Sequence, residues 1–199
     1  MKRKFFTAIL SICLLLTGCV SATTPTKNSV TTANTFTSTL IKGAPAFSTD
    51  KKANIGIAAS SCAILDNMLV LVGGVNNPNN TFAGIEKQMY SKEVYGASVA
   101  ESSKKLKWTK LGELGEPLAY AANVVTNNLY IIGGNHSTGA RSSLIDVKMV
   151  NGVAKKNIIS YLPTTITKAG AAAIGDYLYV VGGIQAGKPS NDLYRINLK

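Results

Sequence analysis

The sequence is short of charge, since Asp, Glu, Lys and Arg make up only 16% of its 199 residues, against about a quarter in an ordinary soluble domain. This balance excludes an acidic disordered chain, a collagen and a coiled coil. Long apolar runs are also missing beyond the N-terminus, which excludes a polytopic membrane protein. The cations outnumber the acids by 21 to 10. They are mostly single, scattered lysines, whereas a nucleic-acid surface is denser and richer in Arg, so we expect no nucleic-acid partner.

Familiar catalytic and metal-binding motifs are lacking as well. The chain has one His, no Cys-x-x-Cys, no His pair at metal-ligand spacing and no Gly-x-Ser-x-Gly. These absences predict no metal and no other cofactor, and they give a hydrolase triad little support. The Gly-Gly pairs of the chain follow strand patterns but open no helix, which argues against a phosphate-binding loop.

The N-terminus carries the pattern of an export signal. Positive residues at 2–4 precede an apolar run over 5–16, which is too short to span a bilayer. The run ends in Leu-Thr-Gly-Cys at 16–19, which resembles the lipobox of bacterial lipoproteins, where the Cys becomes the lipidated mature N-terminus. We therefore predict a signal peptide over 1–18, lipid on Cys19, and anchoring to a membrane of the bacterial cell envelope, on the periplasmic side. The alternative is an ordinary signal peptide with a chance Cys.

The segment that follows is polar and small. Residues 19–35 are rich in Ser and Thr and predict a solvated tether between lipid and domain. Ser-Thr-Leu-Ile at 38–41 predicts a short strand that ends in a turn around Gly43. Removal of the signal peptide and lipidation of Cys19 leave Cys62 without a disulfide partner, and its apolar neighbours predict a small buried side chain.

The body of the chain repeats itself. A Gly pair occurs at 73–74, 133–134 and 182–183, and each pair directly follows a four-residue apolar strand pattern. Upstream of each pattern lie a polar turn and a strand of small residues. The turns are centred at 65–67, 126–128 and 174–176, where Asp, Asn and Gly tolerate the positive φ of tight hairpins.

The spacing of the Gly pairs, roughly 50 to 60 residues, is typical of kelch-type β-propellers with four short strands per blade. Alternating patterns at 143–147 and 193–198 predict third strands, and 107–111 predicts a fourth strand with Trp108 as the aromatic that packs the blade. We therefore expect an all-β, kelch-type β-propeller over 36–199, with about three blades of a six-bladed ring. The alternative is a single antiparallel sandwich with coincidental Gly pairs. Either the chain is a truncated product, or a second copy completes the ring as a homodimer.

Several strings of the sequence are similar to those of one family. Pro-Leu-Ala-Tyr at 117–120 and the Gly-Gly-Asn-His-Ser-Thr-Gly run at 133–139 resemble the cyclically permuted mutarotases, the kelch-type relatives of N-acetylneuraminate epimerase. The runs at 73–78 and 183–194 are similar to them too. The resemblance covers about 54–199 and corresponds to the N-terminal half of a six-bladed member. It implies an isomerase that interconverts the anomers of sialic acid or a similar sugar.

Mutarotation needs a base for the anomeric hydroxyl and an acid for the ring oxygen. His136, the single His, and Glu116, at the start of a blade, are the candidates. Arg141 is the candidate partner of a sugar carboxylate. The expected contacts to sugar hydroxyls and to the sugar face are Asn76, Asn77, Asn135 and Tyr120. The alternative is that these residues are exposed in loops or pack between blades, and that the domain is a non-catalytic kelch module that binds a glycan or a protein.

Overall fold

The computed structural model describes residues 38–41, 43–45, 56–77, 88–100 and 104–199. The chain divides into two units, Met1–Ser38 and Thr39–Lys199, and all the described strands belong to the second. The described residues form strands and turns and contain no helix, so none of them forms a helix that is long and apolar enough to cross a membrane. The predicted signal peptide, tether and Cys19 lie outside the described residues.

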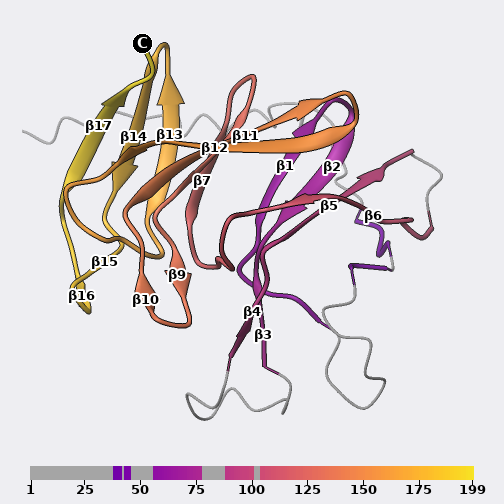
Figure 1. Cartoon of the computed structure of the whole chain (residues 1–199), viewed down its shortest axis with the longest axis horizontal. Coiled ribbons are helices and arrows are strands. Elements are labelled where there is room, and N and C mark those ends of the chain that lie inside the picture. Colours follow the sequence, from indigo (N-terminus) through magenta and orange to yellow (C-terminus); the bar gives the residue numbers. More distant parts are fainter. Residues whose placement is uncertain (1–37, 42, 46–55, 78–87, 101–103) are drawn as a thin grey trace, which may run out of the picture. The chain divides into compact units, whose positions relative to one another are not determined.

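Three antiparallel sheets follow one another along the chain and lie side by side in Figure 1. We call them blades 1, 2 and 3. Blade 1 has the order β1-β2-β5-β6, with strands Ser61–Leu65, Met68–Val72, Glu93–Ser98 and Thr109–Glu113. Blade 2 has the order β7-β8-β11-β12, with strands Ala122–Val125, Leu129–Ile132, Ser143–Val150 and Val153–Tyr161. Blade 3 has the order β13-β14-β17, with strands Gly170–Ile174, Tyr177–Val181 and Leu193–Asn197.

Each blade also carries a short two-stranded hairpin directly after its Gly pair. The hairpins are β3–β4 (Val75–Asn76 with Met89–Tyr90), β9–β10 (Asn135–His136 with Gly139–Ala140) and β15–β16 (Ile184–Gln185 with Lys188–Pro189). They connect the second strand of a blade to its third strand. Because all three hairpins occupy the same place in their blades, they bring polar loop residues of successive blades together.

The turn chemistry that the sequence predicts is present in two of the three inner hairpins. Asp66 and Asn67 both adopt positive φ, at 47° and 60°, and Gly175 does so at 56°. No positive φ occurs at 126–128; the chain there closes through a hydrogen bond from Thr126 N to Asn128 O, so the prediction of a positive-φ turn was wrong at that hairpin.

The Gly pairs mark the places where one blade meets the segment that leads into the next. A Cβ on Gly73 would lie 2.2 Å from the carbonyl oxygen of Leu118, and one on Gly133 would lie 2.2 Å from that of Ile166. Gly74 N in turn donates a hydrogen bond to Leu118 O. Only glycine leaves room for this approach of two backbones, and it also permits the positive φ found at these positions.

Apolar side chains fill the space between successive blades. One buried cluster contains residues of blades 1 and 2, including Val70, Val72, Leu129 and Ile131. A second cluster joins blades 2 and 3. The inner strands β1, β7 and β13 are neighbours. The hydrophobic effect therefore holds the blades to one another as well as together internally.

Three local expectations from the sequence were wrong. Residues 38–41 form no strand. Cys62 is exposed, because it lies on the face of β1 that points away from blade 2. Trp108 precedes β6 and belongs to neither buried cluster; its indole N–H donates to the carbonyl oxygen of Gly43 instead. For Cys62 and Trp108 the strand was predicted close to its place, but a local pattern does not say which segment its side chains will meet.

Candidate functional site

A pocket of about 490 Å³ extends over all three blades. It brings together a lysine, a tyrosine, two carboxamides and two threonines with smaller residues. The lining is made by Gln88, Tyr120, Asn135, Ala140, Thr165, Thr167, Lys168, Ile184, Ala186 and Gly187. Residues of the three blade hairpins and of the segments that enter blades 2 and 3 thus converge on one concave site, which is the usual setting for a small-molecule ligand.

The pocket depends on a strained backbone position that recurs in each blade. Ala59, Tyr120 and Lys168 all have positive φ, between 52° and 57°, and each lies two residues before the first strand of its blade. Tyr120 N donates to Ala59 O at 3.0 Å, and Lys168 N donates to Tyr120 O at 2.8 Å. These hydrogen bonds place one such residue per blade in a row, and non-glycine residues adopt this conformation only where surrounding structure imposes it.

Tyr120 and Lys168 therefore meet in the pocket. The ammonium nitrogen of Lys168 lies 5.2 Å from the centre of the Tyr120 ring, a cation–π distance. Among the described lining residues, Lys168 carries the one positive charge and no residue carries a negative charge. The pocket consequently favours an anionic ligand over a cationic one.

A chain of hydrogen bonds orders the polar wall of the pocket. The Tyr90 hydroxyl donates to Gln88 Oε1 at 2.9 Å and accepts from Asn135 Nδ2 at 3.0 Å. Gln88 Nε2 donates to the Tyr120 hydroxyl at 3.3 Å. Burial raises the pKa of Tyr90, so that this phenol keeps its proton and remains a donor. The carboxamides are thereby held in one orientation, which suits the recognition of ligand hydroxyl groups.

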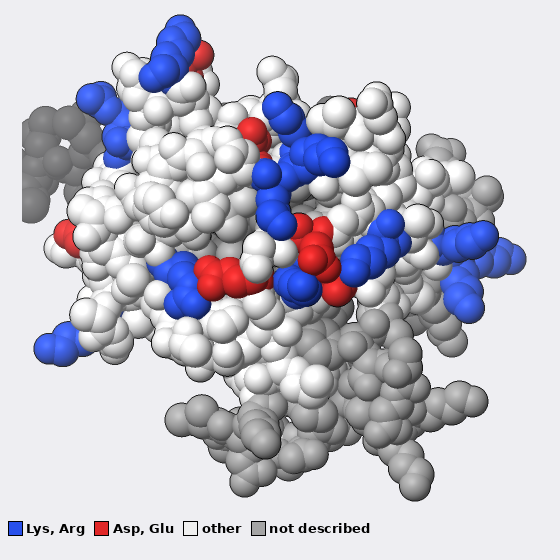
Figure 2. Space-filling model, in the orientation of Figure 1, with Lys and Arg blue, Asp and Glu red and all other residues white. Residues whose placement is uncertain are grey.

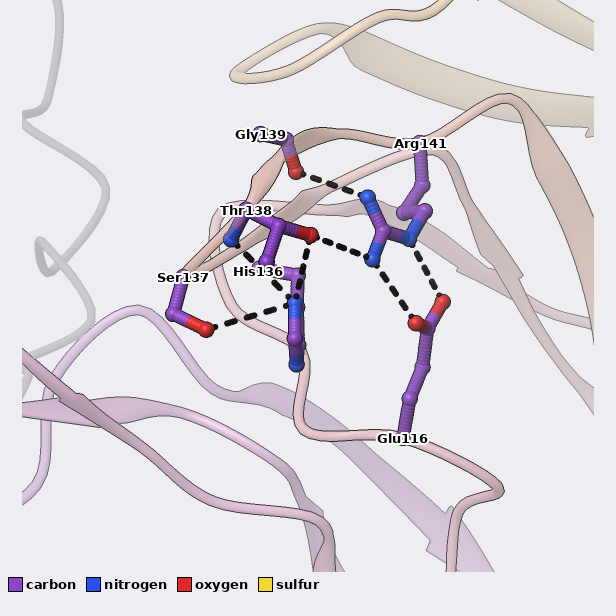
Figure 3. A network of polar contacts seen from close by, with 6 residues as sticks. All are labelled: Glu116, His136, Ser137, Thr138, Gly139 and Arg141. Atoms are coloured by element: carbon purple, nitrogen blue, oxygen red, sulfur yellow. Dashed lines mark hydrogen bonds and ion pairs between the residues drawn. The ribbon is translucent and has the colours of Figure 1, made fainter.

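A second polar network surrounds the β9–β10 hairpin (Figure 3). Arg141 Nε and Nη2 donate to the two carboxylate oxygens of Glu116, at 2.7 and 2.9 Å. Arg141 Nη1 also donates to Gly139 O at 3.1 Å, and Nη2 donates to Thr138 Oγ1 at 3.2 Å. The guanidinium is thus occupied by partners within the chain, in the bidentate geometry that favours a stable pair.

The same network determines the tautomer of His136. Thr138 Oγ1 accepts from Arg141, so its own proton is available for His136 Nδ1, 3.1 Å away. Thr138 N also donates to Nδ1 at 3.3 Å. Nδ1 is therefore an acceptor, and the proton of the neutral ring is on Nε2. Figure 3 shows Nε2 pointing away from the Arg141–Glu116 pair, which leaves it as a hydrogen-bond donor.

The ion pair acts on the acidity of Glu116. Hydrogen bonds from Arg141 hold the pKa of the Glu116 carboxyl below its usual value, although partial burial opposes this. A carboxylate with a lowered pKa is a weaker base, so the pairing limits Glu116 as an acceptor of the anomeric proton.

We expect the Glu116–Arg141 pair to stabilise the protein at neutral pH and to lose this effect in acid. Because folding lowers the pKa of Glu116, its contribution is complete above the unfolded-state pKa and disappears as pH falls through the folded-state value. Glu116→Gln should reduce the free energy of unfolding by ~0.5–1 kcal/mol near neutral pH, since the pair is partly exposed, and by less at acidic pH. Urea denaturation at both pH values measures this difference.

A double variant supplies the control for the pair. Glu116→Gln combined with Arg141→Gln should cost less than the sum of the two single changes, because either one breaks the same interaction. Strict additivity, or a Glu116→Gln effect that grows in acid, would contradict the assignment.

The structure separates the residues that the sequence proposed together. Asn135 and Tyr120 line the pocket, whereas His136, Glu116 and Arg141 belong to the network of Figure 3 and are not among the lining residues. Asn135 and His136 are successive residues of β9, and successive side chains of a strand leave opposite faces. The Asn135 and His136 side chains therefore leave opposite faces of β9, although Tyr90 lies close to both: its hydroxyl bonds Asn135, and its ring centre is 6.4 Å from that of His136.

The remaining predicted contacts lie in blade 1. Asn76 is buried, and its carboxamide donates to Gly56 O. It therefore helps to hold the segment before β1 in place. Asn77 is half-buried directly after β3. Neither lines the pocket that spans the blades.

Sequence reasoning missed Lys168 and Gln88 as pocket residues. Lys168 could have been found by aligning the repeats, because it occupies the position of Tyr120 in the next blade, 13 or 14 residues before the Gly pair. Gln88 has no such signal, since it precedes a short strand that the repeat pattern did not predict.

Charges elsewhere on the domain are paired or dispersed. On the face shown in Figure 2, most acidic side chains lie beside cations, and the other cations are scattered. The described ion pairs of blade 1 include Lys92–Glu113 at 3.1 Å and Lys110–Glu93 at 2.5 Å. The described residues contain no group of three or more His, Cys, Asp or Glu side chains arranged to hold a metal ion.

Comparison with known proteins agrees with this architecture. A family model described as the Kelch motif matches residues 167–199, which comprise blade 3 and the segment entering it. No curated protein matches the chain in sequence. The sheets and the Kelch motif together define the class of fold: the chain forms blades of a kelch-type β-propeller, and the prediction of this all-β fold is confirmed.

The solved structure of a protein called YjhT is similar to this chain. The two share 18% sequence identity with a TM-score of 0.53, and the similarity covers 72% of this chain and 44% of YjhT. The chain thus spans less than half of the length of YjhT. At this level of identity the likeness concerns the fold.

Proposed function

We propose that the chain acts on a carboxylated sugar, N-acetylneuraminate or a similar one, and interconverts its anomers. The observation that carries the proposal is the pocket in which the Lys168 ammonium, the Tyr120 ring and the ordered carboxamide of Asn135 converge. An ammonium binds a carboxylate, while carboxamide and hydroxyl groups bind sugar hydroxyls. The sequence resemblance to the cyclically permuted mutarotases supports the reaction, and the kelch-type fold is compatible with it.

In this proposal the ligand carboxylate pairs with Lys168 rather than with Arg141. Arg141 already donates to Glu116, Gly139 and Thr138, so a ligand would have to displace these partners. Lys168 makes its cation–π contact and faces the pocket. Asn135 and the threonines at 165 and 167 then orient the sugar ring through its hydroxyl groups.

His136 is the proposed hydrogen-bond donor to the ring oxygen. Its Nε2–H is fixed by the hydrogen bonds that Nδ1 accepts, as described above. In a sugar that contacts both Lys168 and His136, the Nε2–H would hydrogen-bond to the ring oxygen. One water molecule would take the proton of the anomeric hydroxyl and another would deliver a proton to the ring oxygen, so that the bond between the ring oxygen and the anomeric carbon breaks.

Exchange spectroscopy by NMR tests the reaction. The anomers of N-acetylneuraminate should exchange faster with the chain than without it. Saturation transfer measures binding in the same samples. We expect His136→Ala to bind but not to accelerate exchange, and Lys168→Gln to bind more weakly and to accelerate exchange less at the same sugar concentration. Lys148→Gln, an exposed change on β11 outside the pocket, is the matched control. No acceleration by the wild-type chain would contradict the catalytic proposal.

A non-catalytic binding module is the second candidate. It is favoured by one observation: the described lining of the pocket contains no carboxylate and no imidazole, the groups that most often transfer protons in such reactions. Binding by the wild-type chain without faster exchange would establish this candidate in place of the first.

We also propose that the chain is a lipoprotein held at a membrane of the bacterial cell envelope, on the periplasmic side. The support is the lipobox-like sequence that ends at Cys19. Cys19→Ala is expected to abolish incorporation of labelled palmitate and to move the protein from the membrane fraction, or to leave it uncleaved. Cys62→Ala, at an exposed position of β1, is the control and should keep the label. Equal labelling of the Cys19 variant would refute the anchor.

A further inference from the structure

The outward face of blade 3 has the composition of a covered face. Val72 of blade 1 and Ile132 of blade 2 directly precede their Gly pairs and are fully buried against the next blade. The corresponding residue of blade 3, Val181, is 52% exposed. Leu144, the cross-strand partner of Ile132, is also fully buried, whereas Leu193, the partner of Val181, is 62% exposed. Blade 3 therefore presents to solvent the positions that blades 1 and 2 use for packing.

Backbone groups along this face of blade 3 also lack the partners that their equivalents have in blades 1 and 2. Gly74 N donates to Leu118 O at 2.7 Å, and Gly134 N donates to Ile166 O at 2.8 Å. Each bond joins a blade to the segment entering the next. The equivalent donor in blade 3, Gly183 N, has no partner among the described residues. The same holds for the Lys168 carbonyl, which would continue the row of hydrogen bonds through Ala59, Tyr120 and Lys168.

The complementary groups are found on the face of blade 1 that points away from blade 2. Ile57 lies two residues before Ala59, as Leu118 lies before Tyr120, and its carbonyl is the equivalent acceptor. Neither Ile57 O nor Ala59 N has a hydrogen-bond partner among the described residues. Ile64, on the same side of β1 as Cys62, is 58% exposed. Blade 1 thus offers the acceptor, the donor and the apolar surface that blade 3 requires.

The space around Gly182 also lacks the backbone segment that lies against the equivalent glycines of blades 1 and 2. A Cβ on Gly73 or Gly133 would lie 2.2 Å from the carbonyl oxygen of the segment entering the next blade. A Cβ on Gly182 would meet nothing nearer than Ser190 O, at 3.5 Å. Blade 3 thus has a glycine where blades 1 and 2 need one for the close approach of a carbonyl oxygen. The carbonyl oxygen equivalent to those of Leu118 and Ile166 is that of Ile57 in blade 1.

We propose that blade 3 is covered by blade 1 of a second copy of this chain. In the resulting dimer each chain contributes three blades, and the two equivalent blade 3–blade 1 contacts close a six-bladed ring about a two-fold axis. Six blades fall within the range in which propellers close, and a closed two-fold arrangement leaves no blade face exposed. Each contact would pair Gly183 N with Ile57 O, and Lys168 O with Ala59 N, across the two copies. The inference does not depend on the proposed catalytic activity.

Sedimentation equilibrium of the full chain, in detergent matched in density to the buffer, tests the proposal. We expect the mass of a dimer for the wild-type chain. Val181→Lys, on the blade 3 face, and Ile64→Lys, on the blade 1 face, should each shift the chain to monomer. Ile158→Lys is the matched control, because Ile158 is 51% exposed on β12 and lies on neither face; it should remain dimeric.

Mixing the two interface variants distinguishes the ring from any other dimer. A Val181→Lys chain keeps an intact blade 1 face, and an Ile64→Lys chain keeps an intact blade 3 face. Their mixture should therefore regain dimers through one unaltered contact, although neither variant dimerises alone. A monomeric wild-type chain, open-ended polymers, or a dimer that survives both substitutions would each overturn the proposal.

Discussion

Gly133→Ala is expected to lower the free energy of unfolding by about 3 kcal/mol or more, a large share of the stability of a domain of this size. The new Cβ would lie 2.2 Å from the carbonyl oxygen of Ile166, a backbone atom that cannot rotate away. Relief requires blades 2 and 3 to separate, which also breaks the hydrogen bond from Gly134 N to Ile166 O. Urea denaturation followed by far-ultraviolet circular dichroism measures the loss.

Gly175→Ala is the matched control for this prediction. Gly175 has φ of 56°, close to the 62° of Gly133, but a Cβ there would meet no atom within 4 Å. It should therefore cost only the ~1–2 kcal/mol of placing a side chain in the left-handed region. The difference between the two variants isolates the close approach of the blades, and equal losses would show that conformational strain alone requires the glycine.

Lys168→Gln is expected to weaken the binding of a carboxylated sugar by about tenfold to a hundredfold, because a hydrogen bond to a charged group contributes ~1.5–3 kcal/mol. The affinity for N-acetylneuraminate can be followed by calorimetry. The substitution keeps a hydrogen-bond donor of similar length and removes the charge, so that the fold and the polar wall of the pocket stay intact. The affinity of the wild-type chain for the sugar should decrease at high salt, since part of the contribution of Lys168 is electrostatic.

A neutral ligand separates the charge from the rest of the pocket. The methyl ester of the same sugar should bind the wild-type and Lys168→Gln chains about equally, and Lys148→Gln should bind the acid like the wild-type chain. If Lys168→Gln retains the full preference for the acid over the ester, another group binds the carboxylate, and Arg141 is then the next to test.

Much of the fold was predictable from the sequence because it depends on short-range patterns. Short apolar runs form β2, β8 and β14, a small-residue run forms β1, and alternating patterns form β11 and β17, all close to the predicted positions, and Asp66-Asn67 makes the expected turn. The repetition of the Gly pairs indicated that these strands form stacked, equivalent units. Trp108 and Cys62 were misjudged for one reason: a local pattern gives the alternation of a strand but does not say which face has a neighbour.

Only some of the residues of the candidate site could be predicted from short-range sequence patterns. The sequence by itself determined that polar residues follow the Gly pairs in loops between strands, and it therefore indicated Asn135, His136 and Arg141 as residues of one region. The tertiary structure decided what each of them meets: Arg141 is paired with Glu116 from an earlier segment, and the cation that lines the pocket is Lys168, from the next blade. The physical reason is that the pocket is assembled from three blades, so its contacts depend on how the blades stack and not on the spacing of residues within any one of them.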